Sequence, residues 1–135
     1  MRSAAYHAAT PSQRRTAHGE LAEVLTAPQY ADQRAWHLGA ATLGVSEPAA
    51  AALVDVAHRA MERSAYAVAA TAFGRSAQLT PDDEVRAERL VAAADAAWLS
   101  GAGDQALQFL DDARSRARQR NMSVEIEHLD RKSVV

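Results

Sequence analysis

Apolar residues in this chain recur three and four positions apart, which is the spacing of an amphipathic α-helix. The clearest case is the stretch 66–81, which reads YAVAATAFGRSAQLTP. One face of the helix predicted here carries two aromatic rings separated by small residues: Tyr66, Ala69, Phe73, Ser76 and Ala77. The small positions let another helix approach closely, and the Thr-Pro pair at 80–81 closes the helix.

The same pattern returns 37 positions later, in the stretch 103–117, which reads GDQALQFLDDARSRA. The equivalent residues are Ala69 and Ala106, Phe73 and Leu110, Ser76 and Ala113. A second amphipathic helix precedes each copy, and its apolar residues also recur at 37: Leu53, Val56, Ala57 and Ala60, then Leu90, Ala93, Ala94 and Ala97. The pattern therefore predicts two copies of one helix pair.

This helix pair resembles a tetratricopeptide repeat (TPR), a unit of about 34 residues whose second helix is followed by a proline. The resemblance implies an all-α fold of antiparallel helix hairpins, stacked as a short TPR-like right-handed solenoid. A few additional residues would then lie in the turns. No alternating apolar pattern typical of a strand persists anywhere in the sequence.

Capping residues indicate where the helices start. Thr10, Pro11 and Gln13 provide a hydroxyl cap, a first-turn proline and a capping-box glutamine, so a helix is predicted from there to about residue 25. Its expected apolar face consists of Ala17, Leu21, Val24 and Leu25. The predicted caps of later helices are Asp32, Ser46, Thr80, Asp104 and Ser123.

The end of the chain indicates an array that continues. The helix from Asp104 is expected to end near Asn121, and a short helix over 124–129 is expected to follow the cap at Ser123. Solenoids normally end in an atypical polar unit. A repeat that has only begun therefore suggests a segment of a longer protein.

Composition narrows the class of protein. The chain has 135 residues, of which 33 are alanine and 5% are aromatic, so helices can approach closely in its core. A net charge of -2 provides no overall basic field for nucleic acid. Cysteine is absent, no apolar run is long enough to span a membrane, and no signal peptide is recognisable. We expect a cytoplasmic protein.

The order of five segments along the chain indicates a family resemblance. These segments are RSAAYHAATPSQRRTAHGELAEVL, RAWHLGAA, AYAVAATAFGRSAQLTP, ERLVAAADAAWLSGAGDQALQFLDDA and VEIEHL. This order resembles the middle of the large LuxR-type ATP-dependent transcriptional regulators of actinobacteria, relatives of the maltose-regulon activator. In that family a P-loop ATPase module and a winged-helix element precede a helical repeat array. A helix-turn-helix at the far C-terminus binds DNA.

The resemblance implies three regions. Residues 1–30 would be the exit helix of a preceding winged-helix region, residues 31–121 TPR-like helical repeats, and residues 122–135 the start of a truncated further repeat. The family's array senses an inducer or a partner and controls ATP-dependent self-association. The sequence has no GxxxxGK[ST] loop and no basic recognition helix at its C-terminus, so ATP hydrolysis and promoter binding are not assigned to it.

The sequence predicts no catalytic, cofactor or metal site. Its histidines lack the spacing of a metal site: His7, His18, His37, His58 and His128. In stacked hairpins of this kind, the first helix of each pair lines the concave groove. The candidate binding surface is therefore His58, Met61, Glu62, Glu88, Val91, Asp95 and Trp98. Trp98 is the expected anchor, although it and Trp36 could each instead pack against an adjacent helix.

The leading hypothesis is a non-catalytic scaffold of a LuxR-type regulator. Its partner would be a protein, another domain of the same regulator or a small-molecule inducer, with neither direct nucleic-acid contact nor a membrane. An open apolar end face would also permit a homodimer. The alternative is a small standalone all-helical enzyme or ligand-binding protein with an internal pocket.

Overall fold

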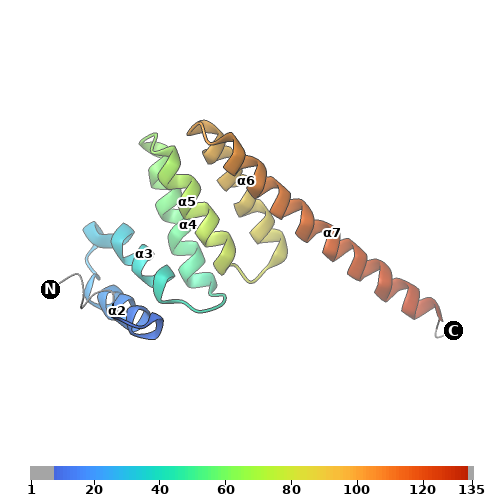
Figure 1. Cartoon of the computed structure of the whole chain (residues 1–135), viewed down its shortest axis with the longest axis horizontal. Helices are drawn as coiled ribbons and strands as arrows, with labels where there is room; N and C mark the ends of the chain where they lie inside the picture. Colours follow the sequence, from blue (N-terminus) through green and yellow to red (C-terminus); the bar gives the residue numbers. More distant parts are fainter. Residues whose placement is uncertain (1–7, 134–135) are drawn as a thin grey trace.

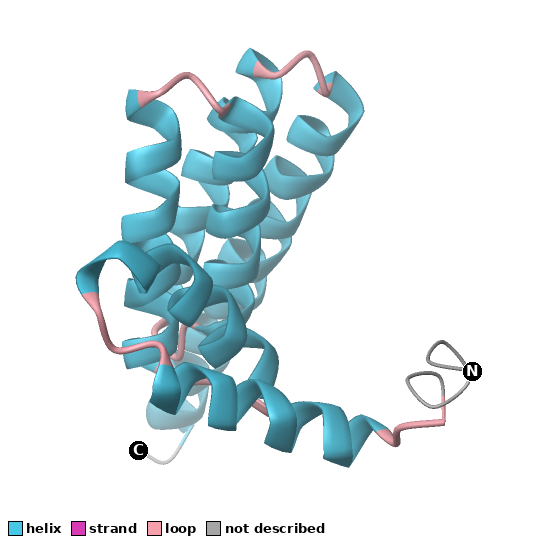
Figure 2. Cartoon of the chain, turned by 90° about the vertical axis from the view of Figure 1, so that its left-hand side faces the viewer, coloured by secondary structure: helices cyan, strands magenta, loops and turns pink. Residues whose placement is uncertain are grey.

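The computed structural model describes residues 8–133, with side chains from 8 to 122, and helices are the only regular secondary structure in that part (Figures 1 and 2). The elements in chain order are α2 (Pro11–Val24), the 3-10 helix η1 (Pro28–Tyr30), α3 (Ala31–Ala41), α4 (Glu47–Glu62), α5 (Tyr66–Leu79), α6 (Asp83–Leu99) and α7 (Gly103–Ser133). Each α-helix packs on the next along the chain. The predicted all-α fold is confirmed.

The helices lie in consecutive pairs. Figure 1 shows α4 behind α5 and α6 behind α7, with α2 and α3 at the end where the chain begins. The first half of α7 lies along α6, and the helix then continues past the other elements. Its 31 residues correspond to a length of about 46 Å at about 1.5 Å per residue.

Alanine dominates the core, as the composition suggested. The residues that recur at 37 positions are buried in both copies of the first helix: Leu53 and Leu90, Val56 and Ala93, Ala57 and Ala94, Ala60 and Ala97. In the second helix, Ala69 is fully buried and Ala106 is 4% exposed. The sequence periodicity therefore matches the burial pattern at these five pairs, whereas Leu110, the counterpart of the buried Phe73, is only half-buried.

Two predicted caps are confirmed. The Thr10 hydroxyl accepts a hydrogen bond from the Gln13 amide at 3.1 Å, and the Gln13 side chain accepts one from the Thr10 amide. Ser46 accepts a hydrogen bond from the Ala49 amide at the start of α4. These contacts satisfy amides that have no partner within their helices.

Three other predicted caps are wrong. Asp82, and not Thr80, caps α6, because the buried Thr80 hydroxyl donates to the Ser76 carbonyl at 2.7 Å. Tyr30 occupies the cap position of α3, so Asp32 lies in the first turn of that helix. Asp104 likewise lies in the first turn of α7.

The predicted apolar face of α2 is also wrong. Ala22 is its buried residue, whereas Leu21 and Val24 are 45% and 78% exposed. The contact side of α2 is made of small residues, since a Cβ on Gly19 would lie 3.8 Å from the Cβ of Ala41 in α3. Close approach through glycine and alanine turns the larger apolar residues outward.

The break predicted near Asn121 does not occur, because α7 continues to Ser133. In the first copy, Pro81 follows α5 and prevents its continuation. The residue 37 positions after Pro81 is Arg118, and neither glycine nor proline follows Gly103 in the sequence. Ser123 therefore lies within a helix and does not start one.

Candidate functional site

An open apolar groove of about 380 Å³ lies between α6 and α7. Residues from both helices line this groove: Val91, Ala94, Asp95, Trp98, Ala106, Leu107 and Leu110. Asp95 is the one charged residue in that set, and the alanines form part of the lining. We call this feature the α6/α7 groove.

Helix geometry explains how the groove forms. Val91, Asp95 and Trp98 are four and three positions apart, so they share one face of α6. Gly101 adopts a φ of +85°, a conformation that glycine accepts easily, in the turn that leads into α7. Gly103 then starts α7 beside the Trp98 ring, since a Cβ on this glycine would be 3.6 Å from Cζ3 of the ring. The turn thus places α7 along the groove side of α6.

The large apolar side chains of the groove are exposed. Trp98 is 68% exposed, Leu107 63% and Val91 51%. Burying apolar surface releases about 25 cal/mol per Å², so covering these side chains would be favourable. Exposed apolar groups gathered in one place mark association surfaces. Of the two interpretations of Trp98, the structure therefore favours the exposed side chain.

The other predicted surface residues lie elsewhere. His58 is exposed outside the groove, and its ring packs edge-on against Phe73 of α5 at a centroid distance of 5.7 Å. Met61 is half-buried and packs against the core. Glu62 and Glu88 are exposed and are not among the residues that line the α6/α7 groove.

Sequence reasoning missed Leu107, and it placed Leu110 only in the core. The available signal was weak. Leu107 follows the core residue Ala106 directly, so it lies on an adjoining face of the helix and was not part of the 37-residue pattern. Its counterpart in the first copy is Ala70, and the change from alanine to leucine at this position was the visible clue.

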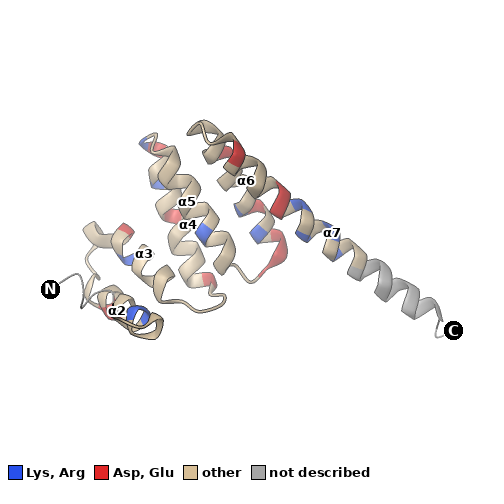
Figure 3. Ribbon diagram, in the orientation of Figure 1, with Lys and Arg blue, Asp and Glu red and all other residues tan. Residues whose placement is uncertain are grey.

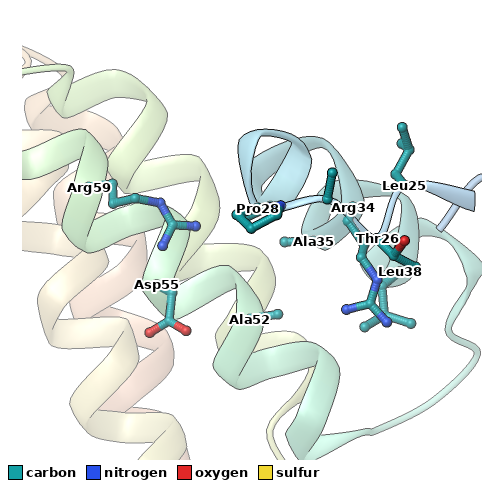
Figure 4. A pocket seen from close by; sticks show the side chains of 11 residues that line it. Leu25, Thr26, Pro28, Arg34, Ala35, Leu38, Ala52, Asp55 and Arg59 are labelled. Atoms are coloured by element: carbon teal, nitrogen blue, oxygen red, sulfur yellow. The ribbon is translucent and has the colours of Figure 1, made fainter. Parts of the chain in front are cut away.

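A second pocket, of about 230 Å³, lies between the α2–α3 connection and α4 (Figure 4). Its apolar lining is Leu25, Ala27, Pro28, Ala31, Ala35, Leu38 and Ala52, and its polar lining is Thr26, Arg34, Asp55 and Arg59. Figure 4 shows Asp55 and Arg59 projecting from α4, with Arg34 on the opposite side. The volume lies below the roughly 300–1,000 Å³ of most drug-sized ligand sites.

Both arginines of this pocket already have partners within the protein. Arg59 forms an ion pair with Asp32, which ties α4 to α3. Nε of Arg34 donates to the Ala22 carbonyl at 3.1 Å and so holds the end of α2. The pocket could accept a small ligand that has an apolar part and a charged group. Its arginines also have structural roles, so their presence alone does not define a ligand site.

An arginine network joins three helices at one end of the core. Arg89 in α6 makes two hydrogen bonds to the Glu47 carboxylate in α4, at 3.0 and 2.7 Å, and one to the Thr80 hydroxyl at 2.6 Å. Arg86 donates twice to the Thr80 carbonyl. The hydrogen bond from Arg89 lowers the pKa of Glu47 from its ordinary value of 4.5, against the opposing effect of burial.

Two histidines join α2 to α3. Nδ1 of His18 lies 2.8 Å from Nδ1 of His37, so one nitrogen donates and the other accepts. Within the described residues, no group of three or more histidine, aspartate or glutamate side chains is placed to hold a metal ion. Both signs of charge are mixed along the described helices (Figure 3).

No protein-family model, no curated protein and no solved structure matches this chain. None of the described helices combines the length and the apolar character that crossing a membrane requires.

Proposed function

We propose that the chain is a TPR-like right-handed stack of helix hairpins that serves as a non-catalytic scaffold. The equivalent burial of residues 37 positions apart carries this proposal. Hairpins that share one set of contacts can stack side by side and expose one face per unit. In this proposal the scaffold belongs to a LuxR-type transcriptional regulator of the cytoplasm, and it binds a protein partner or senses an inducer.

The α6/α7 groove is the proposed binding surface. It combines three exposed apolar side chains with one carboxylate, and tryptophan is enriched among residues that dominate binding energy. In this proposal, Trp98 anchors the partner and Asp95 fixes its orientation. In the same proposal, His58 and Met61 belong to the first hairpin, where His58 contacts Phe73 and Met61 packs against the core, and they do not contact the partner.

The coding sequences on both sides of this one test the regulator assignment. A P-loop ATPase module on the amino-terminal side and a helix-turn-helix on the carboxyl-terminal side would support it. If neither module is present, the regulator assignment is wrong, although the scaffold proposal stands.

A double variant in the encoded regulator tests the groove. Trp98→Ala with Asp95→Asn should abolish the transcriptional response to the inducer, while circular dichroism and the urea midpoint of the 135-residue chain stay unchanged. The matched control is Leu43→Ala with Glu20→Gln, since both residues are exposed and lie outside the groove. A full response from the groove variant would contradict the proposed surface.

The pocket shown in Figure 4 is the observation behind the second candidate function, a protein that binds a ligand smaller than a drug-sized molecule. Thermal shift against sugars, amino acids and nucleotides tests it. A ligand-induced rise in Tm that disappears in Asp55→Asn would support this candidate. A rise with ATP would contradict the expectation, based on the missing GxxxxGK[ST] loop, that the chain does not bind nucleotide phosphates.

A further inference from the structure

The α6/α7 groove has a counterpart within the same molecule. Shifting its residues back by 37 positions leads to a face of α4 and α5 that includes Val54, Met61, Ala70 and Phe73. In that first copy, Ala70 is 1% exposed and Phe73 6%. Val54 and Met61 are half-buried and pack against the core. Apart from the exposed His58, which corresponds to Asp95, this face is therefore covered in the first copy, whereas its large apolar residues are open in the second.

The element beside the first-copy face is itself a helix hairpin. Helix α6 packs along α5, and α7 reaches α5 through single side chains, since Leu90 of α6 and Ala113 of α7 meet Ala77 of α5. The Phe109 ring lies so close to Gly74 that an added Cβ would be 2.9 Å from two of its atoms. The buried residues of α6 are one leucine and four alanines, and Phe109 is the aromatic ring that α7 places against α5.

We infer that the partner of the α6/α7 groove is another alanine-lined helix hairpin, which stacks on this hairpin as α6 and α7 stack on α5. This inference rests on the proposed scaffold function and names the kind of partner. The groove lining fits such a partner, because Ala94 and Ala106 allow close approach of a helix. Val91, Trp98 and Leu107 then provide the large side chains that the incoming hairpin buries.

The chain's own hairpin provides the probe. A second copy of residues 82–117, with Trp98→Phe in that copy only, is joined to the C-terminus of the full 135-residue chain by a flexible Gly/Ser linker. The C-terminal end of α7 lies about 37 Å along the helix from the groove, at about 1.5 Å per residue. A linker of about 45 residues has a root-mean-square length near 37 Å, and tethering raises the effective concentration towards millimolar.

Fluorine NMR of 5-fluorotryptophan reports on Trp98 and Trp36 separately. The tethered hairpin should shift the Trp98 resonance, remove its sensitivity to H₂O/D₂O exchange and raise the Tm, while leaving the Trp36 resonance in place. The matched control carries Leu107→Glu in the groove of the parent chain. Because Leu107 is exposed, this change should leave the parent fold intact and abolish all three effects.

Two results would overturn the inference. One is an unchanged Trp98 resonance and an unchanged Tm in the tethered protein. The other is a Trp98 that is already protected in the untethered chain, together with a dimer mass in light scattering, since a second copy would then occupy the groove. If the tether fails but Trp98→Ala with Asp95→Asn still abolishes the response of the regulator, the scaffold proposal survives and only the hairpin partner is wrong.

Discussion

The contact between Gly39 in α3 and Leu53 in α4 provides a quantitative test of how the first helices are joined to the rest. Leu53 is fully buried, and a Cβ added to Gly39 would lie 3.0 Å from its Cδ1 atom. Leu53→Ala removes three carbon atoms, worth about 2.4 kcal/mol at about 0.8 kcal/mol each. A residual cavity on the order of 60 Å³ adds about 1.4 kcal/mol at roughly 24 cal/mol per Å³. We therefore expect the free energy of unfolding to fall by about 4 kcal/mol.

The second change in this test is Gly39→Ala. Alone, it gains about 1 kcal/mol in helix propensity, and crowding against Leu53 offsets most or all of that gain. In the Leu53→Ala background, the crowding is gone and the new methyl group fills part of the cavity. The double variant should therefore be more stable than the sum of the single changes by about 1 kcal/mol or more.

Urea unfolding followed by circular dichroism at 222 nm gives the free energy of unfolding of the parent chain, the two single variants and the double variant. Leu107→Ala serves as the control for replacing a leucine in a helix. Because Leu107 is 63% exposed, this substitution should lower the free energy of unfolding by less than about 0.5 kcal/mol. Strict additivity of the two changes within about 0.3 kcal/mol would show that α3 does not pack on α4 through this pair. A loss below about 1 kcal/mol for Leu53→Ala alone would lead to the same conclusion.

Two further variants test the hydrogen bonds between helices. Lowering the pH below 4.5 should remove the stabilisation from the Glu47–Arg89 pair. The pKa of Glu47 is lowered in the folded state, so the pair contributes its full stabilisation only at pH values above the ordinary pKa of 4.5. The loss of stability should be at most about 1 kcal/mol, because this carboxylate is half-exposed. In Arg89→Met, the urea midpoint should depend less on pH. An equally steep pH dependence in that variant would exclude the Glu47–Arg89 pair as its cause. Ser76→Ala removes a 2.7 Å hydrogen bond to the Ala50 carbonyl, worth about 1 kcal/mol, and regains roughly 0.5 kcal/mol in helix propensity. A loss above about 2 kcal/mol in urea unfolding would mean that the buried hydroxyl does more than join α5 to α4.

Periodicity predicted the parts of the fold that depend on local contacts. The recurrence from Leu53 to Leu90 and from Ala69 to Ala106 identified buried positions correctly, since residues three and four apart on a helix must share a face. The caps at Thr10 and Ser46 were also predictable, because a side chain near the chain's own amides needs no tertiary information.

Contacts between distant segments were harder to predict. Thr80 looked like a cap, but Arg89, nine residues later, and Ser76 engage its hydroxyl in the folded chain. Leu21 and Val24 looked like a core face, but α2 packs through the small residues Gly19 and Ala22. The groove was predicted in part, since Val91, Asp95 and Trp98 are on one helix, whereas Leu107 comes from α7.

The alanine contacts between these helices have a mechanical consequence. When single methyl groups separate two backbones, there is little side-chain length available to rearrange, so the spacing between helices is set by the backbones themselves. A force applied at one end of the α4–α7 array would then pass along it as a shift of whole helices, with little absorbed by changes in side-chain rotamer. These packed helices would then resist bending, and replacing one alanine by a larger residue should change the angle between two helices at that contact alone.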